Sequence, residues 1–544
     1  MTPPVEPEAA LSSPLTPPLP QRPGERLLWG RLRGAARALA IAAAAQRHPG
    51  LVLALVEDVQ AATRLRDALA FFLGDGADQG NIPLLGFPDW ETLPYDVFSP
   101  LPELVSERLL TLHRLPGLKR GVLVVPVATL LQRLPPRDYV DGHSLVLAVG
   151  DRLDLDATRR RLERSGYSCV SQVMGHGEFA VRGSILDCFP MGSTEPLRID
   201  LLDDEVDTIR TFDPETQRTR ERLTQVRMLP AREFPLSEEA ISGFRQRYRA
   251  LFAGDPQASL IYREVSEGRT PGGLEYYLPL FFEQTATLFD YLPDGCLALE
   301  PEGCRDAGAA FLDGVQARYE QRRHDVERPL LPPTQVYLET DELAHRLKGL
   351  TGVRYERSEL DERRKGYAEA HNFATLALPP LGIQARAAHP AQAIQDFLAI
   401  PGRRVLFVAE GLGRREMLND HLRGFGINAR PVAGWAAFLK GSNAVGLTVA
   451  PLEQGLWLAH PDLAIVTETQ LYGERVRQDR RRRARERDGD AVVRNLTELT
   501  PGSPVVHEDH GVGRYLGLET LTVGGLTTEF LTLEYAKGDK LYVP

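Results

Sequence analysis

The sequence predicts an α/β multidomain protein with an inserted β-hairpin domain, a small α/β domain and a small antiparallel β-barrel at the C-terminus. Three patterns carry this prediction. Apolar strand-like runs alternate with helical spacing up to about residue 140, which is typical of a parallel sheet. Apolar and polar residues then alternate between turn signals at residues 172–219, and short runs punctuated by glycine pairs occupy residues 501–544.

Length and composition limit the classes of protein that fit. The 544 residues suffice for roughly three to five domains, and the 43% hydrophobic and 25% charged content is that of an ordinary soluble protein. A formal net charge of -10 argues against non-specific nucleic-acid binding by the whole chain, although it permits a local basic patch. The four cysteines lack metal-ligand spacing, so neither a zinc site nor a disulfide framework is indicated.

The N-terminal region carries no targeting signal that we recognise. Residues 1–25 are rich in proline and lack the basic and apolar regions of a signal peptide, so we expect a disordered tail. No apolar run reaches the ~18 residues that a membrane span needs. We therefore expect a cytoplasmic protein that has no membrane partner.

Residues 26–145 form the first half of an α/β domain. Residues 51–57 are a continuous apolar run of the buried-strand type, residues 61–73 return to helical spacing, and residues 121–134 repeat strand and then helix. The aromatic residues in the stretch 87–100 would suit a stacking platform for single-stranded bases. Its three prolines favour instead a fixed loop whose rings pack onto the sheet.

Residues 146–230 are predicted to form two consecutive β-hairpins. The first pairs residues 178–182 with 185–189, and the second pairs 197–202 with 206–212. Arg182 points away from the core, because Phe179 and Val181 share the opposite face of its strand.

The arginines of these hairpins, Arg182 and Arg198, have two interpretations. They are interface anchors, since a guanidinium makes paired hydrogen bonds to carboxylates, or they are solvated residues that pair with Asp187 or Asp200. The turn at residues 203–205 contains three acids, which would suit a metal-dependent hydrolase, but side chains in one tight turn point in different directions.

Residues 231–345 are expected to form the second half of the α/β domain. A helix is predicted over residues 237–252, followed by loop, helix and strand. The carboxylates Glu283, Asp290 and Asp294 lie near one another in sequence. Without a histidine or a metal-spaced partner, we interpret them as part of a solvated helix face.

A second, smaller α/β unit is expected over residues 370–470. Gly411 and Gly413 follow a strand, but the third glycine of a dinucleotide-binding turn is absent. Residues 462–468 form a strand that ends in an acid, like a Walker B element, yet no phosphate loop precedes it. Arginines and acids interleave over residues 471–494, which favours a solvated linker helix over a nucleic-acid contact.

A family resemblance becomes visible at the hairpins. Four motifs occur here in this order: GEFAVRG, a D-FP-G turn, LRID and FD--TQR. With these motifs the segment resembles the second domain of UvrB and of the transcription-repair coupling factor family. The resemblance implies that this domain docks the nucleotide-excision-repair protein UvrA through Arg182, Arg198 and Leu202. Leu202 is a departure, since the family has phenylalanine at that position.

The resemblance also bears on nucleotide binding. UvrB carries a GxxxxGK[ST] loop after its first strand, in which backbone amides and a lysine hold phosphates. The matching stretch here contains Gly34, but Ala36, Arg37 and Ala38 replace the last glycine, the lysine and the hydroxyl residue. We therefore expect no nucleotide hydrolysis and no cofactor in this chain. The alternative is an ATP-dependent UvrB-type excision helicase.

The last region, residues 495–544, resembles the RNA-polymerase-interacting domain shared by coupling factors and CarD-type regulators. The resemblance rests on two stretches, VVHEDHGVGRY and the final KLYVP. It implies contact with the polymerase β subunit through Val506, His507 and Glu508, although Glu508 replaces an expected apolar residue. In the family, ATP, magnesium and most double-stranded DNA contacts belong to a translocase motor that follows this region and is missing from the sequence.

Overall fold

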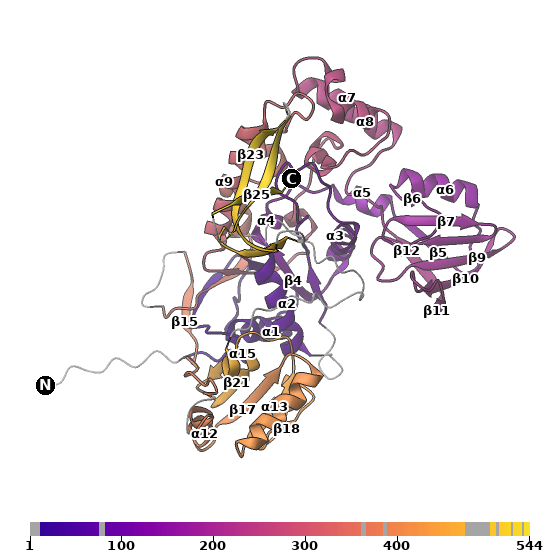
Figure 1. Ribbon diagram of the computed structural model, residues 1–544. Helices are drawn as coiled ribbons and strands as arrows, with labels where there is room; N and C mark the ends of the chain where they lie inside the picture. The colour runs from indigo at the N-terminus through magenta and orange to yellow at the C-terminus, as the bar shows by residue number, and fades with distance from the viewer. Residues whose placement is uncertain are drawn as a thin grey trace.

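The computed structural model describes most of the chain and shows a mixed α/β architecture with several sheets (Figure 1). The described residues are 11–74, 82–360, 366–384, 389–473, 501–507, 511–523, 526–535 and 538–543. Among them, no helix is both long and apolar enough to cross a bilayer. The predicted Arg-rich linker lies almost wholly outside the described residues.

The first domain is built on a fully parallel seven-stranded sheet. Its strands in spatial order are β15 (Glu369–Asn372), β1 (Arg26–Gly30), β14 (Thr351–Tyr355), β13 (Leu297–Pro301), β2 (Leu51–Val56), β4 (Gly121–Pro126) and β3 (Leu84–Gly86). β2 is buried along its whole length, which explains why its sequence is continuously apolar. Its alternate residues enter two different cores, one on each face of the sheet.

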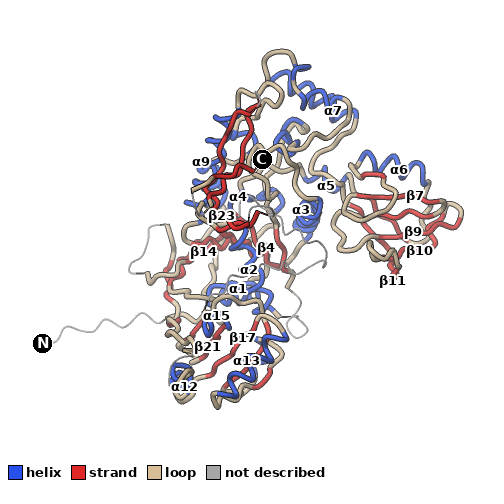
Figure 2. The backbone as a smooth tube through the Cα atoms, in the orientation of Figure 1, coloured by secondary structure: helices blue, strands red, loops and turns tan. Residues whose placement is uncertain are grey.

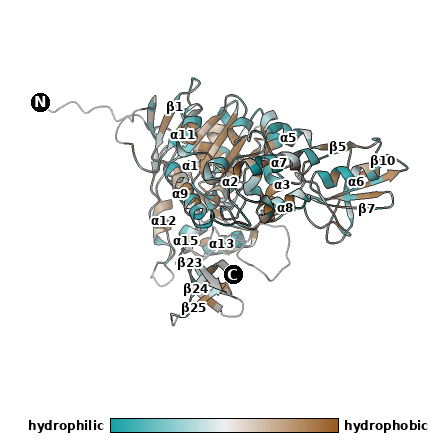
Figure 3. Ribbon diagram, turned by 90° about the horizontal axis from the view of Figure 1, so that it is seen from above, coloured by the Kyte–Doolittle hydropathy of each residue, from teal (hydrophilic) through white to brown (hydrophobic). Residues whose placement is uncertain are grey.

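Helices pack against both faces of this sheet. The helices of the domain are α1 (Ala36–Arg47), α2 (Val59–Leu73), α3 (Pro102–Arg114), α4 (Val127–Leu130), α5 (Arg137–Gly142), α7 (Glu238–Leu251), α8 (Leu260–Ser266), α9 (Cys304–Arg322), α10 (Pro333–Val336) and α11 (Thr340–Lys348). Of these, α1 and α2 pack on one face of the sheet, and α4 and α9 pack on the other. Short 3-10 turns cover Leu115–Gly117, Pro256–Ala258, Leu274–Leu280 and Leu288–Tyr291. Figure 3 shows the apolar strands in brown and many polar helices in teal.

The expected disordered tail is wrong for residues 11–25. Ser12 bridges to Phe373 beside β15, and the Trp29 indole donates a hydrogen bond to the Pro18 carbonyl at 3.1 Å. Leu15 and Leu19 pack against the core next to α1. Residues 11–25 are therefore ordered against the domain, through these hydrogen bonds and the partly buried leucines.

The inserted domain is a separate lobe at the right of Figure 2. Its main sheet has the order β11 (Thr219–Leu223), β10 (Glu205–Phe212), β9 (Leu197–Leu202), β8 (Ile185–Cys188), β7 (Glu178–Arg182) and β6 (Ser168–Cys169). β5 (Leu145–Ala148) pairs with β12 (Gln225–Met228), and α6 (Leu155–Arg164) covers the core. Both predicted hairpins are present, with pairings β7–β8 and β9–β10.

The smaller α/β domain has a mixed six-stranded sheet. The spatial order is β16 (Thr375–Leu376), β20 (Leu456–Leu458), β21 (Leu463–Thr467), β17 (Arg404–Ala409), β19 (Val445–Val449) and β18 (Arg430–Pro431). Its helices are α12 (Gln392–Leu398), α13 (Leu412–Gly424), α14 (Trp435–Lys440) and α15 (Glu468–Tyr472).

The two α/β domains share one hydrophobic core. Leu406 and Ile465 from the smaller sheet join the cluster that contains Leu39 of α1 and Phe72 of α2. The boundaries expected at residues 345 and 370 also shift, because β14 and β15 both belong to the first sheet. The smaller domain is therefore an integral second layer over α1 and α2.

The C-terminal unit is a four-stranded antiparallel sheet in the described residues. Its order is β22 (Pro504–His507), β23 (Gly511–Val523), β24 (Leu526–Glu534) and β25 (Lys540–Val543). Gln321, near the end of α9, donates a hydrogen bond to the Thr520 hydroxyl of β23 at 2.6 Å. The sheet thus lies beside α9 (Figure 1).

Candidate functional site

One face of the inserted sheet carries all three residues predicted to dock UvrA. In the strand register, Asp187 pairs with Arg198, and Ile185 pairs with both Arg182 and Asp200. Because directly opposed residues of antiparallel strands point to the same side, these side chains share one face. Leu202 lies two residues beyond Asp200 and faces the same way. The opposite face enters the core of the lobe.

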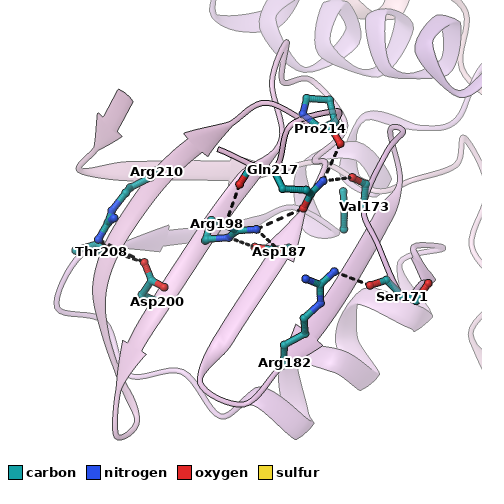
Figure 4. A network of polar contacts seen from close by, with 10 residues as sticks. All are labelled: Ser171, Val173, Arg182, Asp187, Arg198, Asp200, Thr208, Arg210, Pro214 and Gln217. Carbon is teal, nitrogen blue, oxygen red and sulfur yellow. Dashed lines mark hydrogen bonds and ion pairs between the residues drawn. The ribbon is translucent and has the colours of Figure 1, made fainter. Parts of the chain in front are cut away.

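Arg198 is held by a network on this face (Figure 4). Its guanidinium donates to both Asp187 oxygens, at 2.7 and 2.9 Å, and to the Gln217 carbonyl at 3.2 Å. It also lies over the Phe212 ring, 4.9 Å from the centroid. The bonds to Asp187 raise the pKa of Arg198, against the opposing effect of burial. Of the two interpretations of Arg198, the structure therefore shows the pairing with Asp187.

Arg182 and Leu202 are more available than Arg198. The Arg182 guanidinium donates one hydrogen bond, to the Ser171 carbonyl at 2.5 Å, and the described residues show no carboxylate paired with it. Leu202 is 71% exposed. Arg182 lies on β7 and Leu202 on β9, so the two strands are separated by two strand spacings, a lateral distance of about 10 Å. The sheet thus presents a charged donor on β7 and an apolar side chain on β9, both nearer than Arg198 to the turns that follow these strands.

The lobe is attached to the first domain through buried polar contacts. The Arg108 guanidinium on α3 donates to Glu233, directly after the chain leaves the lobe, and both side chains are 0–1% exposed. The Ser106 hydroxyl accepts a hydrogen bond from the Gly192 amide at 2.8 Å. The Tyr139 hydroxyl donates to the Arg232 carbonyl at 3.0 Å. These contacts set the orientation in which the lobe presents its outer face.

The position that matches a phosphate loop is occupied by the chain itself. Gly34 lies between β1 and α1 with φ +55°, and the following Ala35 amide donates to the Gly455 carbonyl at 3.0 Å. A Cβ on Gly34 would lie 2.2 Å from that oxygen. Ala36 and Ala38 are buried and Arg37 is half-buried. The N-terminus of α1, where a phosphate would bind, therefore faces the backbone of the smaller domain.

Gly455 is a residue that the sequence reasoning missed. It comes directly before β20, and a Cβ there would meet the Ile465 carbonyl at 2.0 Å. Only the lone glycine before an apolar run marks it in the sequence. No local pattern could have shown that its carbonyl reaches α1.

The aromatic loop at residues 87–100 packs mainly into the core. Phe87, Trp90 and Tyr95 are buried, and the Tyr95 hydroxyl donates to the Leu331 carbonyl at 2.9 Å. Phe98 differs, since 66% of it is exposed. Packing therefore explains three of the four rings.

Two of the other acidic residues singled out in the sequence, Asp290 and Asp462, have structural uses. Asp290 caps a 3-10 turn by accepting the Thr287 amide at 2.7 Å, and Asp462 accepts hydrogen bonds from Arg403 and Trp457. Within the described ranges, no group of three or more histidine, cysteine or acidic residues is arranged to hold a metal ion. The turn at residues 203–205 accordingly gives no support to a hydrolase site.

The C-terminal sheet presents an exposed apolar pair. Val506 of β22 is opposite Val512 of β23, and these residues are 77% and 68% exposed. Tyr515 and Leu533 are buried instead. The backbone of His507 pairs with Gly511, whereas Glu508 lies outside the described residues. Val506 is thus placed where it can contact a partner.

Three family descriptions match separate parts of the chain. "UvrB interaction domain" matches residues 145–234, "MFD, D3 domain" matches 397–471, and "CarD-like/TRCF RID domain" matches 499–544. The first match covers the inserted lobe, the second most of the smaller α/β domain, and the third the C-terminal sheet.

Similar proteins match nearly the whole chain. It is 42% identical over 529 residues to a transcription-repair-coupling factor of Escherichia coli and 40% identical over 532 residues to one of Haemophilus influenzae. Each alignment covers 97% of this chain and 45% of the relative. A Bacillus subtilis relative of the same name is 28% identical over 550 residues. The chain therefore spans a little under half the length of these curated relatives.

Proposed function

We propose, from the similarity of 97% of this chain to transcription-repair-coupling factors, that it docks two proteins. The inserted lobe binds UvrA through Arg182, Arg198 and Leu202. The C-terminal sheet binds the RNA polymerase β subunit around Val506. Together the two surfaces recruit repair proteins to a polymerase stalled at a lesion.

The observation that carries the proposal is the common face of the three lobe residues. Arginine is enriched among the residues that anchor protein interfaces, and Leu202 adds apolar surface that a partner can bury. The match of the lobe to a UvrB interaction domain supports the same use. In the whole protein, we place ATP- and magnesium-dependent translocation on double-stranded DNA in the part of the relatives that this chain does not span.

Binding to UvrA should depend on Arg182 and Leu202. We expect Arg182→Ala and Leu202→Ala each to weaken binding by about 2 kcal/mol, because both remove exposed anchors without exposing a buried partner. Isothermal titration calorimetry of the purified chain with UvrA measures this. Arg227→Ala, which removes an exposed arginine from the lobe's other sheet, is the control.

Arg198 needs a separate design, because its removal alone would leave Asp187, which is 2% exposed, without its charged partner. Arg198→Ala combined with Asp187→Asn avoids that buried charge. Folding of each variant is checked by circular dichroism. If folded variants at Arg182, Arg198 and Leu202 all bind UvrA like the parent, the assignment of this face is wrong.

We also propose that the first domain of this chain does not bind nucleotide. The Gly455 carbonyl already accepts the α1 amide that a phosphate would use, and Ala38 offers no hydroxyl for magnesium. Titration of the chain with labelled ATP and magnesium should therefore show no stoichiometric binding. A one-to-one complex would instead favour the excision-helicase alternative.

A further inference from the structure

Arginines continue across the inserted sheet beyond the residues considered so far. In the strand register, Arg198 of β9 pairs with Arg210 of β10, which pairs in turn with Arg222 of β11. Opposed residues share a face, so these three side chains stand in one row on the face that carries Arg182. We call Arg198, Arg210 and Arg222 the arginine row.

The contacts of each arginine with carboxylates weaken along the row, from Arg198 to Arg222. Arg198 has a two-bond contact with Asp187, whereas Arg210 lies 3.6 Å from Asp200, which also accepts a hydrogen bond from Thr208. The Arg210 Nε atom is buried and has no hydrogen-bond partner. Arg222 is exposed, and no carboxylate of the described residues pairs with it.

Such a row is unfavourable for the isolated lobe. Like charges directly opposite each other on a sheet repel, and Asp187 and Asp200 offset only the first two arginines. A second carboxylate-bearing surface laid across the row would offset this repulsion and could form forked hydrogen bonds with the guanidinium groups. The charge pattern therefore specifies the chemistry of the occupant.

We propose that the docking surface extends along the arginine row to Arg210 and Arg222 and that it takes a carboxylate-rich segment of UvrA. This inference rests on the proposed UvrA docking and adds where the partner's charge lies. Arg182, Arg198 and Leu202 form the centre of the contact. Arg222, at the edge strand, attracts the acidic segment and sets the register of the complex.

A charge reversal at Arg222 tests the extension. Arg222→Glu should weaken UvrA binding at least tenfold, slow association and reduce the dependence of the affinity on salt, since rim charges act largely through long-range attraction. Calorimetry and association kinetics at two salt concentrations measure these effects. Arg222→Lys, which keeps the charge, should retain association close to that of the parent.

Arg227→Glu is the matched control. It makes the same charge change at an exposed arginine of the same lobe, but on β12 of the other sheet. Two outcomes would contradict the extension. In one, Arg222→Glu and Arg227→Glu weaken UvrA binding equally. In the other, neither of them weakens binding although Arg182→Ala does, and the central docking face then stands without the extension. A folded parent chain that fails to bind UvrA overturns both proposals.

Discussion

Replacing Arg108 with methionine should lower the free energy of unfolding of the first domain by about 3–5 kcal/mol, the cost of leaving one partner of a buried ion pair uncompensated. The guanidinium donates to Glu233 at 2.5 Å and to the Pro88 carbonyl at 2.8 Å, and it lies 4.4 Å from the centroid of the Phe87 ring. Urea unfolding followed by tryptophan fluorescence measures the loss, because Trp90 packs against the same guanidinium.

A neighbouring pair supplies the control for Arg108. Arg66 and Glu107 also form an ion pair, at 3.0 Å, but both side chains are about 40% exposed. Arg66→Met should therefore cost no more than about 1 kcal/mol. Combining Arg108→Met with Glu233→Gln should recover part of the loss, since the uncompensated charge is gone. Equal losses for Arg66→Met and Arg108→Met would contradict the argument.

Gly34→Ala should lower the stability of the joined α/β domains by about 3 kcal/mol. Two causes add: a side chain in left-handed backbone is strained, and the new Cβ would lie 2.2 Å from the Gly455 carbonyl oxygen. The contact must open, so the smaller domain should also become more sensitive to proteolysis. Thermal unfolding and limited proteolysis measure the two effects.

Gly24→Ala separates backbone strain from the steric clash. Gly24 has φ +74°, and no atom lies within 4 Å of a Cβ built on it. Its replacement should cost about 1 kcal/mol and leave proteolysis of the smaller domain unchanged. If the two alanine variants lose the same stability, the close approach of Gly34 to Gly455 does not hold the domains together.

Local patterns predicted the hairpins well, for a physical reason. The strands β7 to β10 are neighbours in sequence, and alternation plus a turn specifies both their pairing and the face of each side chain. The outward direction of Arg182 followed directly. The pairing of Arg198 with Asp187 was one of two open interpretations, because alternation places both on one face without fixing their rotamers.

Local patterns could not predict the contacts between segments that are distant in sequence. The parallel sheet brings β1 next to β14 and β15, which are more than three hundred residues away, so no turn signal marks the pairing. The sequence of the ordered segment after residue 10 looked disordered because it is rich in proline, and only two partly buried leucines, Leu15 and Leu19, pack it against the core. Likewise, the α1 sequence showed that a phosphate loop was altered, but not that Gly455 occupies its place.

The bonds that hold Arg198 bear on the thermodynamics of the proposed docking. A free arginine side chain loses about 2 kcal/mol of rotamer entropy when an interface immobilises it. Asp187, Gln217 and Phe212 already restrict Arg198 in the unbound lobe. Much of that entropy is lost during folding rather than during association, so a partner meets one arginine that is ready to bind and others that must still be ordered.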